Sequence, residues 1–175
     1  MKIMFEKFFP DEYLGSTYKI PFEKLYEQGY RGVIFDIDNT LVPHGAPADE
    51  RAKRLFQRLK KIGFQCCLIS NNKEPRVKMF NEKIQVAYVY NAHKPSKKNY
   101  IKAMEIMGTD QTNTLFVGDQ LFTDVWGAKR VGIHNILVHP INPKEEIQIV
   151  LKRYLEKIVL HFYKKSKKRL KKVAN

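Results

Sequence analysis

Polar side chains that can do chemistry follow four apolar runs of this 175-residue chain. The segments are DIDNT (36–40), SNN (70–72), HKP (93–95) and GDQLFTD (118–124). The run before each segment has the length and composition of a buried strand. Because ligands bind beyond the carboxyl ends of parallel strands, we expect three carboxylates, a lysine and a hydroxyl to converge there.

Such a cluster of carboxylates predicts a metal site. Neighbouring carboxylates repel one another and lose hydration on burial, so a cation must compensate them. Mg2+ suits one or two carboxylates together with waters and a substrate phosphate. A carboxylate can also attack phosphorus and form an aspartyl-phosphate, while a lysine and the metal neutralise the phosphoryl group. The pattern favours Mg2+-dependent hydrolysis of a phosphomonoester.

The elements that must position these residues alternate along the chain. Strands that are apolar on both faces, with helices between them, are typical of a parallel sheet covered on both sides. We therefore predict an α/β fold, a Rossmann-like three-layer sandwich with a central parallel sheet of about five strands. The predicted strands are 33–35, 64–69, 86–90, 114–117 and 135–138, and the predicted helices are 48–61, 75–80, 96–107, 124–130 and 143–163.

The spacing of the four segments limits what can be inserted between them. Asp36, Ser70, Lys94 and Asp119 are 34, 24 and 25 positions apart. Each interval holds one helix and one strand, and none can hold a cap domain. We predict that residues 1–175 form a single domain with an open site, which suits a bulky or surface-bound substrate.

The four motifs resemble, in residue type and order, those of HAD-superfamily phosphatases. DIDNT matches the Asp-x-Asp-x-Thr signature, and Ser70, Lys94 and GDQLFTD match the other three motifs. FFPDEYLGSTYKI, ISNN, HKPSKK and VGDQLFTDVWGAKR are similar to the YqeG subfamily of HAD IIIA phosphatases, up to about Pro140. A related mitochondrial branch dephosphorylates phosphatidylglycerophosphate, so the resemblance makes that lipid the leading expected substrate.

The resemblance also implies a catalytic and metal-binding role for each aspartate. Asp36 would be the nucleophile, and Asp38 the general acid and then the base for the attacking water. Asp36, the main-chain carbonyl of Asp38 and Asp119 would bind Mg2+, with Asp124 supporting that site.

The remaining motif residues would hold the phosphoryl group and the loops around it. Ser70 would donate a hydrogen bond to the phosphoryl group, and Lys94 would stabilise both phosphate and nucleophile. Thr40 would fix its loop, and we expect Thr40 and Asn71 to contribute to substrate binding. Alternatively, Ser70, Asn71 and Asn72 belong to a helix cap before Pro75. His44 and His93 flank the expected site, and their roles stay open.

The C-terminal region carries much of the charge. The chain has 32 Lys and Arg against 18 Asp and Glu, a net charge of +14. We predict an amphipathic helix at 143–163 and a basic tail at 164–175, with seven cations and no acid. Such a tail would contact an anionic membrane surface or, as a weaker hypothesis, RNA. The apolar stripe of the helix is Ile147, Leu151, Tyr154, Leu155, Ile158 and Phe162.

Two rival functions and a cellular location follow from the same features. One rival is the same chemistry on a soluble or protein phosphomonoester. The other is a non-catalytic RNA- or ribosome-binding protein acting through its basic tail, which intact catalytic motifs argue against.

Adjacent Cys66 and Cys67 would point to opposite faces of a strand, so no disulfide joins them and a reducing cytoplasm is expected. We predict a cytoplasmic protein, peripheral at the inner face of the membrane.

Overall fold

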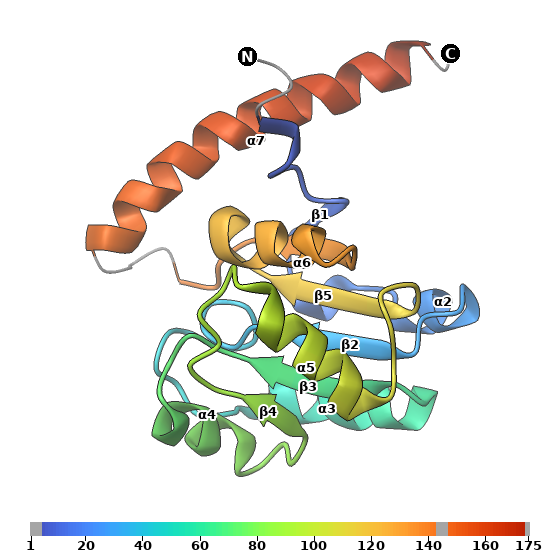
Figure 1. Ribbon diagram of the computed structural model, residues 1–175, viewed down its shortest axis with the longest axis vertical. Helices are drawn as coiled ribbons and strands as arrows, with labels where there is room; N and C mark the ends of the chain where they lie inside the picture. The colour runs from blue at the N-terminus through green and yellow to red at the C-terminus, as the bar shows by residue number, and fades with distance from the viewer. Residues whose placement is uncertain (1–4, 143–146, 174–175) are drawn as a thin grey trace.

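A six-stranded, all-parallel sheet forms the centre of the computed structural model (Figure 1). The structure describes residues 5–142 and 147–173, with the side chains of 147–151 and 170–173 outside that description. The strand order is β1-β6-β5-β2-β3-β4. The strands are β1 (Glu12–Leu14), β2 (Gly32–Phe35), β3 (Gln65–Ile69), β4 (Ala87–Val89), β5 (Thr114–Gly118) and β6 (His134–Val138).

Helices cover both faces of this sheet. The helices α2 (Phe22–Glu27), α3 (Glu50–Ile62) and α4 (Glu74–Asn81) pack on one side, and α5 (Lys97–Met107) and α6 (Trp126–Arg130) on the other. In Figure 1, α3 lies behind the sheet and α5 in front of it. Successive side chains of a strand point to opposite faces of the sheet, so each strand packs alternately against the two layers of helices. The prediction of an α/β three-layer sandwich is confirmed.

The predicted number of about five strands is one too low. The additional strand, β1, has three half-buried residues and pairs in parallel with β6 at one edge of the sheet. Its sequence, Glu-Tyr-Leu, is too short to show an apolar period. The pairing partner lies more than a hundred positions away, so no local signal marks this segment as a strand.

The helices α3 and α5 end where the sequence predicts their last turns. The helix α3 begins after Asp49, whose carboxylate accepts a hydrogen bond from the Ala52 amide at 2.7 Å. Gly63 ends α3 at φ +111°, and Gly108 ends α5 at φ +65°. Both values lie in the left-handed region that glycine adopts without a steric penalty, so these glycines terminate their helices.

The connections between the site-bearing strands are short. Within residues 5–142, β2 and β3 are joined through α3, β3 and β4 through α4, and β4 and β5 through α5. No cap domain is inserted in these connections, as predicted.

The C-terminal helix is longer than predicted. The helix α7 spans Ile147–Val173, so residues 164–173 continue a helix and do not form a separate tail. Lysine and arginine are good helix formers, and this stretch has no Gly or Pro to stop it. Cations near a helix C-terminus are also stabilised by the helix dipole. The predicted start at 143 lies outside the described residues.

A third apolar cluster holds α7 against the body. Val159 packs on Leu121, Val125 and Leu137. The aromatic rings of the N-terminal segment also reach α7, since Phe5 stacks on Phe162 with ring centroids 5.5 Å apart. Figure 1 shows α7 beyond α6, extending past the rest of the molecule. None of the helices in the described ranges has the length and apolarity to cross a membrane.

The two cysteines are free, as expected from their places on a strand. Cys67 is buried and Cys66 is half-buried in β3. Burial raises the pKa of each thiol to about 12, so both are protonated at neutral pH.

Candidate active site

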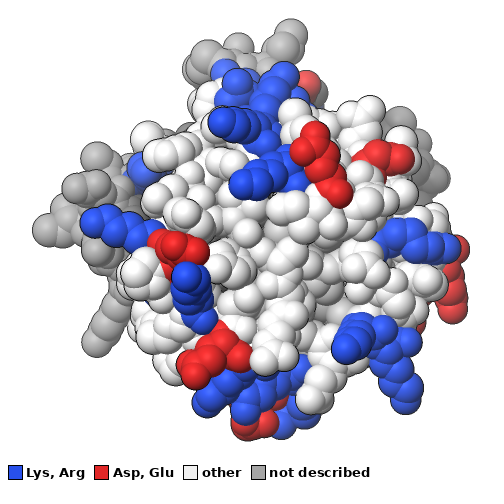
Figure 2. Space-filling view, turned by 60° about the horizontal axis from the view of Figure 1, so that its bottom comes forward, with Lys and Arg blue, Asp and Glu red and all other residues white. Residues whose placement is uncertain are grey.

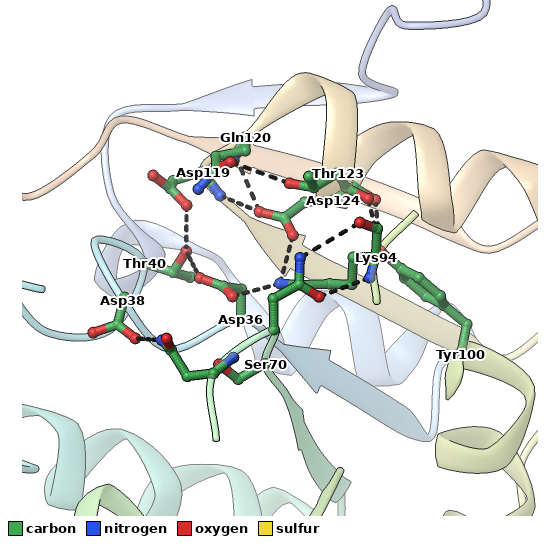
Figure 3. A network of polar contacts seen from close by, with 12 residues as sticks. Asp36, Asp38, Thr40, Ser70, Lys94, Tyr100, Asp119, Gln120, Thr123 and Asp124 are labelled. Atoms are coloured by element: carbon green, nitrogen blue, oxygen red, sulfur yellow. Dashed lines mark hydrogen bonds and ion pairs between the residues drawn. The ribbon is translucent and has the colours of Figure 1, made fainter. Parts of the chain in front are cut away.

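The four sequence motifs meet at the carboxyl ends of the central strands (Figure 3). Asp36 follows β2, Ser70 follows β3 and Asp119 follows β5, while Lys94 lies beyond β4. Lys94 Nζ is 2.5 Å from Asp36 Oδ1 and 2.7 Å from Asp124 Oδ1. The parallel topology brings the ends of these strands to one edge of the sheet.

Three buried aspartates form the centre of this site. Asp36, Asp119 and Asp124 each offer a carboxylate oxygen, and these oxygens lie within 4.8 Å of one another. The hydroxyl of Thr40 lies 3.1 Å from Asp36 Oδ2 and 3.3 Å from Asp119 Oδ1. A buried set of hard oxygen donors is the kind that Mg2+ and similar divalent cations prefer.

The electrostatics of the protein favour such a cation. Burial raises the pKa of Asp36 to about 6, although Lys94 opposes the rise. Burial and the Asp36 charge hold the pKa of Asp119 well above its usual range, against the effect of Arg153. Burial also works against the charge on Lys94, but Asp124 and Asp36 raise its pKa above the ordinary value. A divalent cation would compensate the carboxylates that are unfavourably charged in its absence, so the residues present fit one.

In the loop after β5, the Asp124 side chain folds back on the first residues of the loop. Asp124 lies in the π-helix η2 (Leu121–Val125), and its Oδ2 accepts hydrogen bonds from the Asp119 and Gln120 amides at 3.2 and 3.1 Å. A Cβ on Gly118 would lie 2.5 Å from that same oxygen. Glycine at this position therefore lets the Asp124 carboxylate pack directly over the end of β5.

Asp38 points away from the buried triad, as Figure 3 shows. Its Oδ1 accepts hydrogen bonds from the Gly45 amide and from Arg76 Nη2, both at 2.8 Å. Its Oδ2 accepts one from Asn72 Nδ2, also at 2.8 Å. The tight turn is made possible by Asn39 at φ +61°, a conformation that asparagine tolerates better than most residues.

The residues after β3 fix the position of the loop that carries Lys94. Ser70 is buried, and its hydroxyl accepts a hydrogen bond from the Asn72 amide at 3.1 Å. Asn71 Oδ1 accepts from the Lys94 amide at 2.7 Å, and Asn71 Nδ2 lies 3.4 Å from the Lys94 carbonyl oxygen. The alternative that Ser70, Asn71 and Asn72 cap the next helix is wrong, because α4 has Lys73 at its N-cap position.

The two flanking histidines are both exposed. His44 Nδ1 lies 3.8 Å from Asp38 Oδ1, beyond hydrogen-bonding distance, and its side chain is about half exposed. His93 is exposed beside Lys94, with φ +48°.

Residues that the motifs did not reveal also contact the site. Arg153 of α7 donates through Nη1 to the Asp119 carbonyl oxygen at 2.5 Å, and through Nη2 to Asp119 Oδ2. Glu156 accepts a hydrogen bond from the Leu121 amide at 2.7 Å and pairs with Arg153 at 3.0 Å. Glu156 is the only Asp or Glu from 147 to 175, so its isolation among basic residues could have marked it in the sequence. No feature of the sequence marked Arg76, which donates a hydrogen bond to Asp38.

Comparisons with known proteins agree with this geometry. Residues 45–132 match the haloacid dehalogenase-like hydrolase family. The chain is 37% identical to a protein of Bacillus subtilis (strain 168) named as a probable phosphatase, YqeG, over 93% of this chain and 95% of that protein. It is 27% identical to the chloroplastic/mitochondrial phosphatidylglycerophosphate phosphatase 1 of Arabidopsis thaliana, over 79% of this chain and 45% of that protein.

Solved structures share the same fold. The cobalt-bound deoxy-D-mannose-octulosonate 8-phosphate phosphatase of Haemophilus influenzae superposes with a TM-score of 0.51. The match has 14% identity and covers 82% of this chain and 93% of that one. With the family match and the YqeG relative, the order of the motifs identifies this chain as a member of the haloacid dehalogenase-like hydrolases, a phosphatase that hydrolyses phosphoric monoesters.

Proposed function

We propose that this phosphatase is Mg2+-dependent and works through an aspartyl-phosphate on Asp36. The observation that supports this most directly is the buried triad with Lys94 held on its first member. Asp36, Asp119 and the main-chain carbonyl of Asp38 would hold Mg2+, with Asp124 supporting them. Once bound, Mg2+ would neutralise the negative charge that gathers on the phosphoryl oxygens.

In the first step the Asp36 carboxylate attacks phosphorus, and the bond from phosphorus to the leaving oxygen breaks. Lys94 and Thr40 each contact one oxygen of Asp36, so the carboxylate is fixed before the substrate arrives. Such pre-organisation removes part of the entropic cost of reaching the transition state. Lys94, buried and positively charged, also lies where phosphoryl charge accumulates.

Asp38 would move the protons. As general acid it gives a proton to the leaving oxygen. As base it then takes one from the water that attacks the aspartyl-phosphate, which releases inorganic phosphate and regenerates Asp36. In the structure Arg76, Asn72 and the Gly45 amide hold Asp38 away from the triad, so its side chain must rotate toward the leaving group. Ser70 would donate its hydroxyl proton to a phosphoryl oxygen.

Substitution of the nucleophile tests this mechanism. Asp36→Asn should abolish hydrolysis of p-nitrophenyl phosphate in Mg2+, because an amide cannot form the acyl-phosphate, while the circular dichroism spectrum stays that of the wild type. Beryllofluoride should bind to wild-type protein in Mg2+ and fail to bind to Asp36→Asn. Activity retained in a folded, contaminant-free Asp36→Asn preparation would remove Asp36 from this role.

We further propose phosphatidylglycerophosphate as the physiological substrate, with the enzyme cytoplasmic and peripheral at the inner face of the membrane. The name of the Arabidopsis relative supports the substrate. The uncapped connections beside the site support a bulky, surface-bound substrate. The competing hypothesis is a soluble or protein phosphomonoester. Phosphate release from lipid and soluble phosphomonoesters, compared side by side in Mg2+, separates the two.

A further inference from the structure

The helix α7 has two apolar sides, and only one of them packs on the protein. Val159 and Tyr163 are buried against the body. Tyr154, Leu155 and Ile158 face outward, with 66%, 51% and 42% of their surfaces exposed. Large apolar side chains grouped on one exposed helix surface indicate an interaction site.

The exposed side of α7 is also free of negative charge over 152–169, where the structure describes its side chains. Glu156, the one acid there, is buried on the Leu121 amide and on Arg153. On the face drawn in Figure 2, by contrast, acidic side chains lie among the basic ones. Within 152–169, the exposed cations of α7 are Lys152, Lys157, Lys164, Lys165, Lys167, Lys168 and Arg169.

This surface is held next to the catalytic machinery. Arg153 precedes Tyr154 in the chain and contacts both the carbonyl and the carboxylate of Asp119. Glu156, one residue after Leu155, binds the loop that carries Asp124. The exposed apolar group therefore begins within one helical turn of a residue that touches the expected metal site.

From these three observations we propose that Tyr154, Leu155 and Ile158, with the surrounding cations, bind the surface of an anionic phospholipid bilayer. A helix with apolar and cationic side chains together lies at the boundary between headgroups and acyl chains. RNA phosphates could bind the Lys and Arg side chains of α7. RNA offers no comparable apolar region for Leu155 and Ile158, because contacts to the phosphate backbone are polar. The biological role of this surface rests on the proposed lipid substrate, whereas the arrangement of its residues does not depend on that substrate.

Vesicle binding by the full-length protein tests the proposal without requiring turnover. Vesicles of phosphatidylcholine with and without phosphatidylglycerol would be sedimented with the wild type and with Tyr154→Ser/Leu155→Ser/Ile158→Ser. The matched control is Ile101→Ser/Ile106→Ser, because these residues of α5 are exposed to a similar degree, 43% and 48%. All variants should hydrolyse p-nitrophenyl phosphate like the wild type, which shows that they fold.

We expect the wild type and the control to bind the anionic vesicles, and the α7 variant to bind about tenfold more weakly or not at all. Equal vesicle binding by the α7 variant and the wild type would overturn the proposal. So would wild-type binding to a single-stranded RNA oligonucleotide with none to vesicles. Wild-type vesicle binding through α7 without hydrolysis of phosphatidylglycerophosphate would support the surface and refute the proposed substrate.

Discussion

The two aspartates of the loop after β5 differ in what their side chains already contact. Both oxygens of Asp124 are occupied, one by Lys94 and the other by two backbone amides. Asp119 has Thr40 near Oδ1 and Arg153 on Oδ2, and its Oδ1 lies toward Asp36 across the Thr40 hydroxyl. We therefore propose Asp119 as the direct ligand of the cation and Asp124 as a supporting residue.

This difference predicts unequal effects of two matched substitutions. Asp119→Asn should raise the Mg2+ concentration for half-maximal activity more than Asp124→Asn, because supporting residues commonly contribute about 10- to 100-fold and direct ligands more. Activity on p-nitrophenyl phosphate over a Mg2+ titration measures both. If the wild type and both variants show the same Mg2+ dependence, the metal site lies elsewhere.

The contact between Arg153 and Asp119 predicts a stability effect that depends on the metal. Arg153→Gln removes one cation from a buried carboxylate, which should destabilise the metal-free protein by about 3 kcal/mol. Mg2+ restores positive charge at the same carboxylate, so it should raise the melting temperature of the variant more than that of the wild type. Lys157→Gln, an exposed position on the same helix, is the control. Equal melting temperatures in EDTA would contradict the expectation.

At the level of single residues, the sequence predicted the positions that follow strands. Asp36, Ser70 and Asp119 could be found because each follows the end of an apolar run, and Lys94 because it lies in the loop beyond β4; parallel topology gathers all of these positions at one edge of the sheet. Arg153 could not be placed in this way. Its position depends on how α7 packs, which rests on contacts between distant segments.

The element that supports Asp124 depends on a close approach between two helices. Tyr100 of α5 hydrogen-bonds the Thr123 and Asp124 carbonyl oxygens of η2 at 3.0 and 3.3 Å. Gly127 of α6 lies against the Tyr100 ring, and a Cβ there would be 2.3 Å from the Tyr100 hydroxyl oxygen. The absence of a side chain at Gly127 thus allows Tyr100 to hold the loop.

Gly127→Ala should therefore destabilise the fold by about 1–3 kcal/mol, the usual cost of overpacking a core, and lower the activity by displacing η2. Gly15→Ala is the matched control, because a Cβ on Gly15 meets nothing within 4 Å. Urea denaturation of the wild type and the two variants gives the difference in unfolding free energy. A Gly127→Ala protein as stable as the wild type would show that this contact relaxes freely.

Elements with a strong local pattern were predictable, and those formed by distant pairing were not. The helix α3 has its N-cap, its apolar stripe and its terminating glycine within one segment. The strand β1 exists only through β6, and the π-helix η2 depends on Tyr100 from another helix. Sequence patterns report local preference and burial, so they miss segments whose structure is imposed by a remote partner.

At the scale of the whole molecule, the projecting helix α7 carries ten Lys and Arg and one Glu, which supply +9 of the net charge of +14. Its attraction to an anionic bilayer should weaken as salt shortens the screening length from about 10 Å at 0.1 M to about 3 Å at 1 M. Hydrolysis of phosphatidylglycerophosphate in vesicles should therefore fall over this range, while hydrolysis of p-nitrophenyl phosphate changes little. Parallel losses on both substrates would mean that salt acts on the active site.

The pairing of β1 with β6 also determines the order in which the chain can fold during synthesis. Glu12 of β1 can pair only after Ile136 of β6, 124 residues later in the chain, has been synthesised. Before β5 and its loop are made, β2, β3 and β4 can associate, but Asp36 lacks Asp119 and Asp124 beside it. A nascent chain on the ribosome therefore lacks the partner strand of β1 until β6 has emerged, and it can assemble the buried aspartate triad only after the loop beyond β5 has been made.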